Sequence, residues 1–171
     1  MVGRAIAIDL STNHNVTSID ICQNALDLVK NHGIKTVQAD LSDSSNIPNL
    51  VKEHEFVVSC VPGFMGYNTV KASIEAKKPV VDISFMPEDF MLLNDMAIKN
   101  NVPVIADCGV APGMPNLFLG YHNNNMEVTD FFYMVGGLPK IRNYPFQYKA
   151  CLLYTSPSPR DRTRSRMPSS A

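Results

Sequence analysis

Short apolar segments with the composition of β-strands alternate with helical patterns along most of the chain. Strands are expected over residues 16–20, 35–40, 55–62, 79–84 and 102–105. Helices are expected over residues 1–10, 24–31, 46–53, 65–76, 88–100 and 117–121. The segments 55–62 and 79–84 are almost continuously apolar, which is typical of strands covered on both faces. The alternation predicts an α/β fold with a doubly wound parallel sheet of the Rossmann type.

Composition narrows the class of protein. The 171 residues suffice for one domain, or for one domain and a fragment of another. The first 150 residues carry a net charge of −4, which argues against a nucleic-acid partner. No apolar run has membrane-spanning length, and the four cysteines show neither C-x-x-C nor metal-ligand spacing. We therefore expect a cytoplasmic protein with reduced thiols, no membrane partner and no metal.

The composition changes abruptly at Cys151. Residues 151–171 are rich in Ser, Pro and Arg and have no hydrophobic period, which predicts disorder. Residues 151–161 and 165–171 also resemble the in-frame translation of a sequencing adapter, with 162–164 as its index. We expect that the natural sequence ends at Ala150 in this chain.

The first expected helix has no strand before it. A Rossmann sheet begins with a strand, a glycine-rich turn and a helix, and Gly3 has the place of the third glycine of G-x-G-x-x-G. Asp20 ends the next strand, where a carboxylate binds the ribose 2′-hydroxyl. Asp40 ends the strand after it and would lie near the adenine. These positions predict dinucleotide binding in a sheet that lacks its first strand. Gly3 as a helix-packing residue and the two aspartates as solvated caps are the alternatives.

The cofactor preference follows from Asp20. A carboxylate there repels a 2′-phosphate, and no arginine follows it in residues 21–23. NAD is therefore favoured over NADP.

A loop with two glycines and two prolines spans residues 106–116, between a strand and a helix. Gly109 and Gly113 permit sharp turns, and Pro115 suits the first turn of a helix. In open α/β sheets ligands bind at this carboxyl edge of the strands. Asp107 is therefore a candidate catalytic or substrate-binding residue, with a loop-ordering or helix-capping role as the alternative. Cys108 is read as a packing residue.

The pattern changes after residue 122. We divide the chain into a nucleotide-binding domain, 1–122, and the beginning of a second α+β substrate domain, 123–150. Residues 123–125 are expected to form a turn or linker, and residues 128–135 a strand that leads into Gly136 and Gly137.

Several of these segments resemble the saccharopine dehydrogenase family, with the lysine 6-dehydrogenase-like branch as the nearest match. The resemblance spans residues 2–149. The matching motifs are Ser59-Cys-Val-Pro62, Asp82-Ile-Ser84, Asp107-Cys-Gly-Val-Ala-Pro-Gly113 with Asn116, Val135-Gly-Gly-Leu-Pro139 and Pro145-Phe-Gln-Tyr148.

The resemblance implies a nicotinamide-dependent oxidoreductase that acts on a C–N bond of an amino acid such as saccharopine or lysine. Ser59, Pro62 and Ser84 would line the ribose and nicotinamide. Asp107 would bind the substrate ammonium or accept a proton, which requires a raised pKa. The second domain would bring Gly136, Gly137 and Tyr148 to the substrate, with a turn and a core tyrosine as the alternative reading. The parent enzyme is expected to be a homo-oligomer, and this shortened chain is expected to be inactive.

A different class of protein shares part of the pattern. A nucleotide-sensing Rossmann module without catalytic activity would also have a strand that ends in Asp20. Such a module has no need of the Pro-Gly turn at residues 112–113 or of the Gly-Gly-Leu-Pro turn at 136–139.

Overall fold

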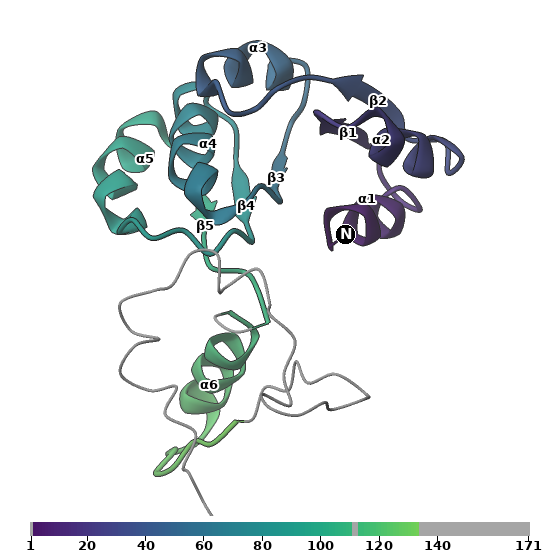
Figure 1. Ribbon diagram of the computed structural model, residues 1–171. Helices are drawn as coiled ribbons and strands as arrows, with labels where there is room; N and C mark the ends of the chain where they lie inside the picture. The colour runs from purple at the N-terminus through teal and green to yellow at the C-terminus, as the bar shows by residue number, and fades with distance from the viewer. Residues whose placement is uncertain (1, 111–112, 134–171) are drawn as a thin grey trace, which may run out of the picture.

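The computed structural model describes residues 2–110 and 113–133 and has an α/β fold (Figure 1). The strands are β1 (Thr17–Asp20), β2 (Lys35–Gln38), β3 (Val57–Ser59), β4 (Val80–Asp82) and β5 (Val104–Ile105). The helices are α1 (Val2–Leu10), α2 (Gln23–Lys30), α3 (Ile47–Val51), α4 (Gly63–Glu75), α5 (Asn94–Asn100) and α6 (Met114–Asn125). Two 3-10 turns, η1 (Ser44–Asn46) and η2 (Phe90–Leu93), precede α3 and α5.

The strands form two separate parallel sheets. One contains β1 and β2, and the other has the order β3-β4-β5. A doubly wound sheet places its first strand in the centre, between the second strand and the fourth. Among the described residues no strand occupies that place between β1 and β3, and Figure 1 shows the two sheets side by side. The prediction of a parallel α/β fold is confirmed, and the division agrees with a Rossmann sheet that lacks its first strand.

Helix α4 covers the larger sheet. Val70 and Ile74 of α4 are fully buried against Val80 of β4. The same cluster contains Met86, Leu93 and Val102. A second side of α4 packs against α3, where Ile47 and Val51 contact Ala72. The smaller sheet has its own core beneath α1 and α2. The packing around β3 and β4 therefore depends on α4.

Glycines set how closely α4 approaches the end of β4. A Cβ added at Gly66 would overlap the Ser84 hydroxyl, and one added at Gly63 would overlap the Phe85 carbonyl oxygen. The segment after β4 thus passes directly beneath the first turns of α4. Only residues without a side chain permit this approach.

Two elements differ from the sequence prediction. Residues 123–125 were expected to form a turn but are the last residues of α6. The Asn125 side chain donates to the Tyr121 carbonyl oxygen at 2.7 Å, and this local bond continues the helix through the asparagines. A strand was expected over 128–135, but residues 128–133 are not in a strand, because no other described segment pairs with them. Residues 134–150, where the rest of the second domain was expected, lie outside the described residues.

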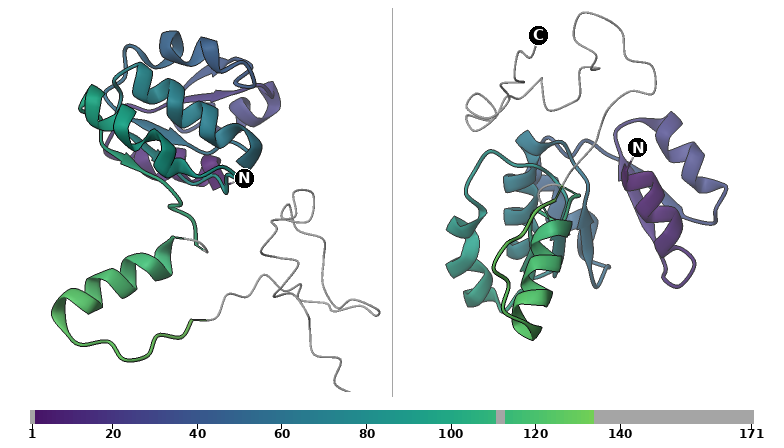
Figure 2. Two further views of the ribbon diagram at one scale, coloured as in Figure 1. Left: turned by 90° about the vertical axis from the view of Figure 1, so that its left-hand side faces the viewer. Right: turned by 90° about the horizontal axis from the view of Figure 1, so that it is seen from below.

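Helix α6 extends away from both sheets (Figure 2). Pro115 is its only buried residue, while Leu117, Phe118 and Tyr121 are exposed. Its first turn contains Pro115 as predicted. Within residues 2–110 and 113–133 no helix has both the length and the apolar character needed to cross a membrane.

Replacing Gly66 with Ala should destabilise the fold. The new methyl group would overlap the Ser84 hydroxyl and push α4 from the sheet, at a cost of roughly 1–3 kcal/mol in the free energy of unfolding. Denaturant unfolding would measure it. Gly120→Ala in α6 is the matched control, because an added Cβ there would meet no described residue outside the adjoining backbone of its own helix within 4 Å. The control should be neutral or stabilising by up to about 1 kcal/mol, and equal effects of the two substitutions would contradict this account.

Candidate functional site

The carboxyl ends of the larger sheet gather several of the predicted site residues. Ser59 ends β3 and is paired in register with Asp82 at the end of β4. Ser84 follows β4, and Asp107 follows β5. Because the three strands are parallel, these ends lie at one edge of the sheet. Ser59 and Ser84 are both buried at this edge of the sheet.

A buried acid lies between the two serines. Asp82 is fully buried, and its Oδ2 accepts hydrogen bonds from the Ser84 N–H at 2.9 Å and the Ser84 hydroxyl at 2.5 Å. Burial raises the pKa of Asp82, and the Ser59 and Ser84 hydroxyls partly offset this effect. Nevertheless, neither Asp82 Oδ1 nor Ser59 Oγ makes a hydrogen bond of normal geometry. We read the Ser59 hydroxyl as a nearby dipole and not as a full partner.

Asp107 has an unusual backbone. Its φ is 55°, in the left-handed region that a residue with a side chain rarely adopts. The next residue, Cys108, donates its N–H to the Asp82 carbonyl oxygen at 3.0 Å, so the loop is tied to the end of β4. Partial burial raises the pKa of Asp107, and the nearby Asp82 raises it further. A carboxyl group with a raised pKa at a strand end suits proton exchange with a ligand.

The loop after Asp107 closes on itself. Gly109 and Gly113 form an isolated bridge, and the Met114 N–H donates to the Gly109 carbonyl oxygen at 2.9 Å. Gly113 has a φ of 132°, and a Cβ there would overlap the carbonyl oxygens of Gly109 and Asp107. The prediction that Gly113 permits a sharp turn is confirmed. Gly113 also precedes α6 directly, so Asp107 is not the cap of that helix.

Cys108 lies beside both acids. Burial raises the pKa of its thiol, and Asp82 and Asp107 add to that effect. A thiol with a raised pKa is a poor nucleophile. This agrees with the reading of Cys108 as a packing residue.

The smaller sheet carries the two other predicted carboxylates. Asp20 ends β1, and its Oδ1 accepts from the Cys22 N–H at 2.8 Å. Asp40 follows β2 and accepts from the Ser42 N–H at 2.8 Å. Hydrogen bonds from Ser42 lower the pKa of Asp40, so it remains ionised. Because β1 and β2 are parallel neighbours, both carboxylates lie at the carboxyl edge of this sheet.

Gly3 and Pro62 occupy the beginnings of two helices. A Cβ at Gly3 would lie 3.1 Å from the Cys60 Cβ, so the first turn of α1 closely approaches the end of β3. We expected Gly3 to pack against the strand that precedes its helix, and the neighbour that the structure provides is Cys60. Pro62 is exposed at the N-cap of α4. Both residues therefore lie near the sheet edge. The predicted substrate residues Gly136, Gly137 and Tyr148 lie outside the described residues.

Asp82 was predicted only as part of a motif shared with a family and was given no role in the site. A charged residue inside the nearly continuous apolar segment 79–84 was the available signal, because burying a carboxyl group is costly. Thr69 of α4 was also missed, and its buried hydroxyl has no hydrogen-bond partner.

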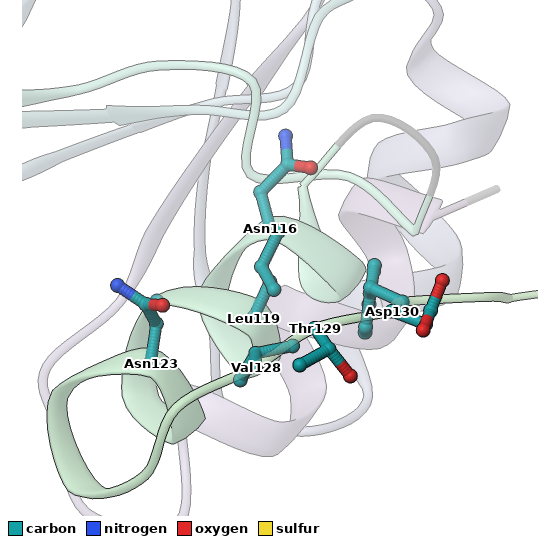
Figure 3. Close-up of a pocket in the computed structure, with 8 residues that line it drawn as sticks. Asn116, Leu119, Asn123, Val128, Thr129 and Asp130 are labelled. Atoms are coloured by element: carbon teal, nitrogen blue, oxygen red, sulfur yellow. The ribbon is translucent and has the colours of Figure 1, made fainter.

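A groove elsewhere does not collect the site residues. It lies between α6 and the segment after it, where Asn116, Leu119 and Thr129 line it (Figure 3). Of the motif residues named above that the structure describes, Asn116 alone lines this groove. In the part of the chain that the structure describes, no group of three His, Cys, Asp or Glu side chains could hold a metal ion.

Comparison with known proteins shows the family of this chain. Residues 1–105 match the family described as the saccharopine dehydrogenase NADP binding domain. The chain belongs to the saccharopine dehydrogenase family. Its match therefore includes the ends of β1 to β4, where Asp20, Ser59 and Asp82 lie.

Three relatives show how much of the chain is shared. A Saccharomyces cerevisiae protein named saccharopine dehydrogenase [NADP(+), L-glutamate-forming] is 25% identical over 81% of this chain and 33% of its own length. An Arabidopsis thaliana alpha-aminoadipic semialdehyde synthase is 26% identical over 68% of this chain and 12% of its own. The apo structure of the L-Glu-forming saccharopine dehydrogenase from S. cerevisiae has a TM-score of 0.63 and 27% identity, over 71% of this chain and 28% of that one. The chain thus spans a third or less of these relatives.

The relatives bear on the cofactor. The matched family is an NADP-binding domain, and the yeast relative is named for NADP(+). These findings support a nicotinamide dinucleotide as the cofactor. They do not support the expectation that NAD is preferred over NADP.

Replacing Gly113 with Ala should open the loop after Asp107. The alanine side chain would overlap two carbonyl oxygens and would be strained at a φ of 132°. We expect faster amide hydrogen exchange at Met114 and Cys108, whose N–H groups hold the loop. Gly120→Ala is the control and should leave both rates unchanged. Unchanged exchange in the Gly113 variant would contradict this role.

Proposed function

We propose that this chain is the dinucleotide-binding part of an oxidoreductase that acts on the C–N bond of an amino acid of the saccharopine type. One observation carries the proposal. The match to the NADP-binding domain of the family spans strands whose carboxyl ends bring Ser59, Asp82 and Ser84 to one edge, with Asp107 at the end of the next strand. The edge combines a site for the cofactor with an acid of raised pKa.

The residues present fit a dinucleotide. The start of α1 packs closely against Cys60 at the end of β3, and a pyrophosphate would lie against the backbone N–H groups at the N-terminus of this helix. Asp20 would hold the ribose hydroxyls of the adenosine half, and Asp40 would lie near the adenine. Ser59, Pro62 and Ser84 would border the nicotinamide half. Ser59 and Ser84 are buried, so they would support this half of the cofactor from beneath the surface that contacts it.

The reaction requires removal of a hydride from carbon and a proton from nitrogen. When bound, the nicotinamide supplies the acceptor for the hydride. Asp107 would bind the substrate ammonium and take up its proton, since its raised pKa lets the neutral and ionised forms both be reached. Residues of the second domain, including Gly136, Gly137 and Tyr148, would complete the site from the substrate side.

We further propose that this chain prefers NAD, unlike the relatives named for NADP(+). The carboxyl edge of β1 and β2 bears Asp20 and Asp40 and has no arginine in residues 21–23. Two carboxylates at this edge would repel a 2′-phosphate and would accept hydrogen bonds from two ribose hydroxyls. The cofactor preference thus depends on charge at one sheet edge.

Replacing Asp20 with Ser should weaken NAD⁺ binding roughly tenfold, because a hydrogen bond to a charged group is lost. The affinity for NADP⁺ should fall less or rise. The dissociation constants for NAD⁺ and NADP⁺ should therefore become more nearly equal. Calorimetric titration, with amide shifts at Cys22 and Ser42 followed by NMR, would measure both. Asp95→Asn, on exposed α5 beside the other sheet, is the control. Tighter binding of NADP⁺ than NAD⁺ by the unchanged chain would contradict the preference.

Activity should require more than this chain. We expect no cofactor reduction by the 171-residue chain with saccharopine or lysine, and reduction by a protein extended to the length of its relatives. Absorbance at 340 nm would follow the reaction, with Asp107→Asn in the extended protein expected to lower kcat by at least about 100-fold. An extended protein that binds dinucleotide but reduces none with any amino acid would support the nucleotide-sensing module instead.

We also propose that the extended protein is a homo-oligomer in the cytoplasm. Size-exclusion chromatography would test its oligomeric state.

A further inference from the structure

Each of the two sheets has one strand edge that turns toward the other sheet. Within residues 2–110 and 113–133, β1 pairs only with β2, and β3 pairs only with β4. Figure 1 shows the two sheets side by side, with β1 on the side of β2 that faces β3. An unpaired edge presents a row of N–H and C=O groups to which a further strand can bind. Two such rows therefore face one position in the order of strands.

The ladder between β1 and β2 shows which backbone groups of β1 are free. The Ala39 N–H donates to the Asp20 carbonyl oxygen at 3.2 Å, so Asp20 turns its backbone groups toward β2. In a parallel pair, alternate residues of a strand turn these groups to the same neighbour. The backbone N–H and C=O groups of Thr17 and Ile19 consequently point away from β2.

The same rule applies to β3. The Val57 N–H donates to the Pro79 carbonyl oxygen at 2.9 Å, and the Ser59 carbonyl oxygen accepts from the Ile83 N–H at 3.0 Å. The residues on either side of Val58 thus bond to the strand β4 and the segment around it. The N–H and C=O groups of Val58 itself point to the opposite side, away from β4.

The apolar side chains at these edges are incompletely packed. Ile19 and Val58 are half-buried, and neither belongs to the three hydrophobic clusters of the described residues. By contrast, β4 has a strand on each side, and its Val80 is buried. A strand between β1 and β3 would add cross-strand neighbours to Ile19 and Val58. Apolar, β-branched residues suit such a position best.

Helix α1 contacts both halves of the molecule. Its Ala7 packs with Val29 and Ile34 in the core of the smaller sheet. In its first turn, a Cβ added at Gly3 would lie 3.1 Å from the Cβ of Cys60, which directly follows β3. The helix therefore holds the smaller sheet against the end of β3 with no strand between them. Such preorganisation lowers the entropic cost of binding a segment to both edges.

We propose that the free edges of β1 and β3 together bind one extended segment of another polypeptide. The segment has about five uncharged, apolar residues, the usual length of a strand, and runs in the common strand direction of a doubly wound sheet. Its backbone bonds to Thr17 and Ile19 on one side and to Val58 on the other. Main-chain bonds supply the affinity, and side chains against Ile19 and Val58 select an apolar segment. This surface uses none of the carboxylates assigned to the proposed reaction.

The test measures amide hydrogen exchange by NMR in the ¹⁵N-labelled 171-residue chain. The probe is a synthetic peptide of about five alternating valine and isoleucine residues, preceded by lysines for solubility. At saturation, exchange of the Thr17, Ile19 and Val58 amides should slow at least about tenfold, because each N–H enters a strand ladder. The matched control peptide has proline at its centre. It should leave these rates unchanged, because proline removes a ladder donor.

Two outer strand edges provide a control within the same chain. The Lys35 N–H donates to the Val16 carbonyl oxygen before β1, so the next residue, Thr36, turns its N–H outward. The Pro103 carbonyl oxygen accepts from β4, so Val104 likewise turns its N–H outward. Each of these edges lies at the end of its strand order, with no second edge of the described chain opposite it. The peptide should leave exchange at Thr36 and Val104 unchanged.

Three results would overturn the proposal. The first is unchanged exchange at Thr17, Ile19 and Val58 in the presence of the peptide, or an equal response to the peptide with proline. The second is equal slowing at Thr36 and Val104, which would indicate that any free edge binds the peptide. The third is slow exchange without peptide that strengthens with chain concentration, since a second copy would then occupy the edges. No outcome depends on a bound dinucleotide, so this test is independent of the dehydrogenase assay.

Discussion

The contact between α4 and the end of β4 supports the rest of the candidate site. Gly63 and Gly66 let the helix backbone lie against the segment that contains Ser84 and Phe85. This approach buries Asp82 and restricts its hydrogen bonding to Ser84. Asp82 in turn ties down the loop of Asp107 through its carbonyl oxygen. A helix packed far enough away to admit water would reduce the burial that raises the pKa of Asp82.

The division of the strands into two sheets gives the site two unequal halves. The β1–β2 edge has exposed or half-buried carboxylates that make only local hydrogen bonds with the residues after them. The β3–β5 edge has buried polar groups under a helix. In the function that we propose, the β1–β2 edge recognises the polar adenosine end of a dinucleotide. The β3–β5 edge then takes the reacting end, where exclusion of water strengthens each electrostatic interaction.

Family membership and the charges of this chain both indicate a nicotinamide dinucleotide. They differ on whether it carries the 2′-phosphate that distinguishes NADP from NAD. Relatives are named for NADP(+), whereas in the function that we propose Asp20 and Asp40 place negative charge near the ribose 2′-position. A change in cofactor preference requires few substitutions, because a single phosphate contact decides it. At about a quarter identity such a change is compatible with the shared fold.

Local sequence patterns were enough to predict most of the fold. The continuous apolar runs before Ser59 and Asp82 predicted buried parallel strands, because periodicity and burial are local properties of the chain. Local sequence patterns were less informative from the end of α6 onward. The asparagines at 123–125 continue a helix through side-chain bonds to the backbone, and a strand over 128–133 lacks a partner. Strand pairing is nonlocal, so composition alone cannot predict it.

The sequence by itself determined the parallel α/β class, the strand ends that carry Asp20, Asp40, Ser59 and Asp107, and the sharp turn at Gly113. These follow from short-range rules of periodicity and backbone sterics. Only the tertiary structure decided that Asp82 is buried without a full set of partners and that Gly66 makes that burial possible. It also decided that Asp107 lies beside Asp82. Residues 25 positions apart in sequence meet there because parallel strands bring their carboxyl ends to one edge.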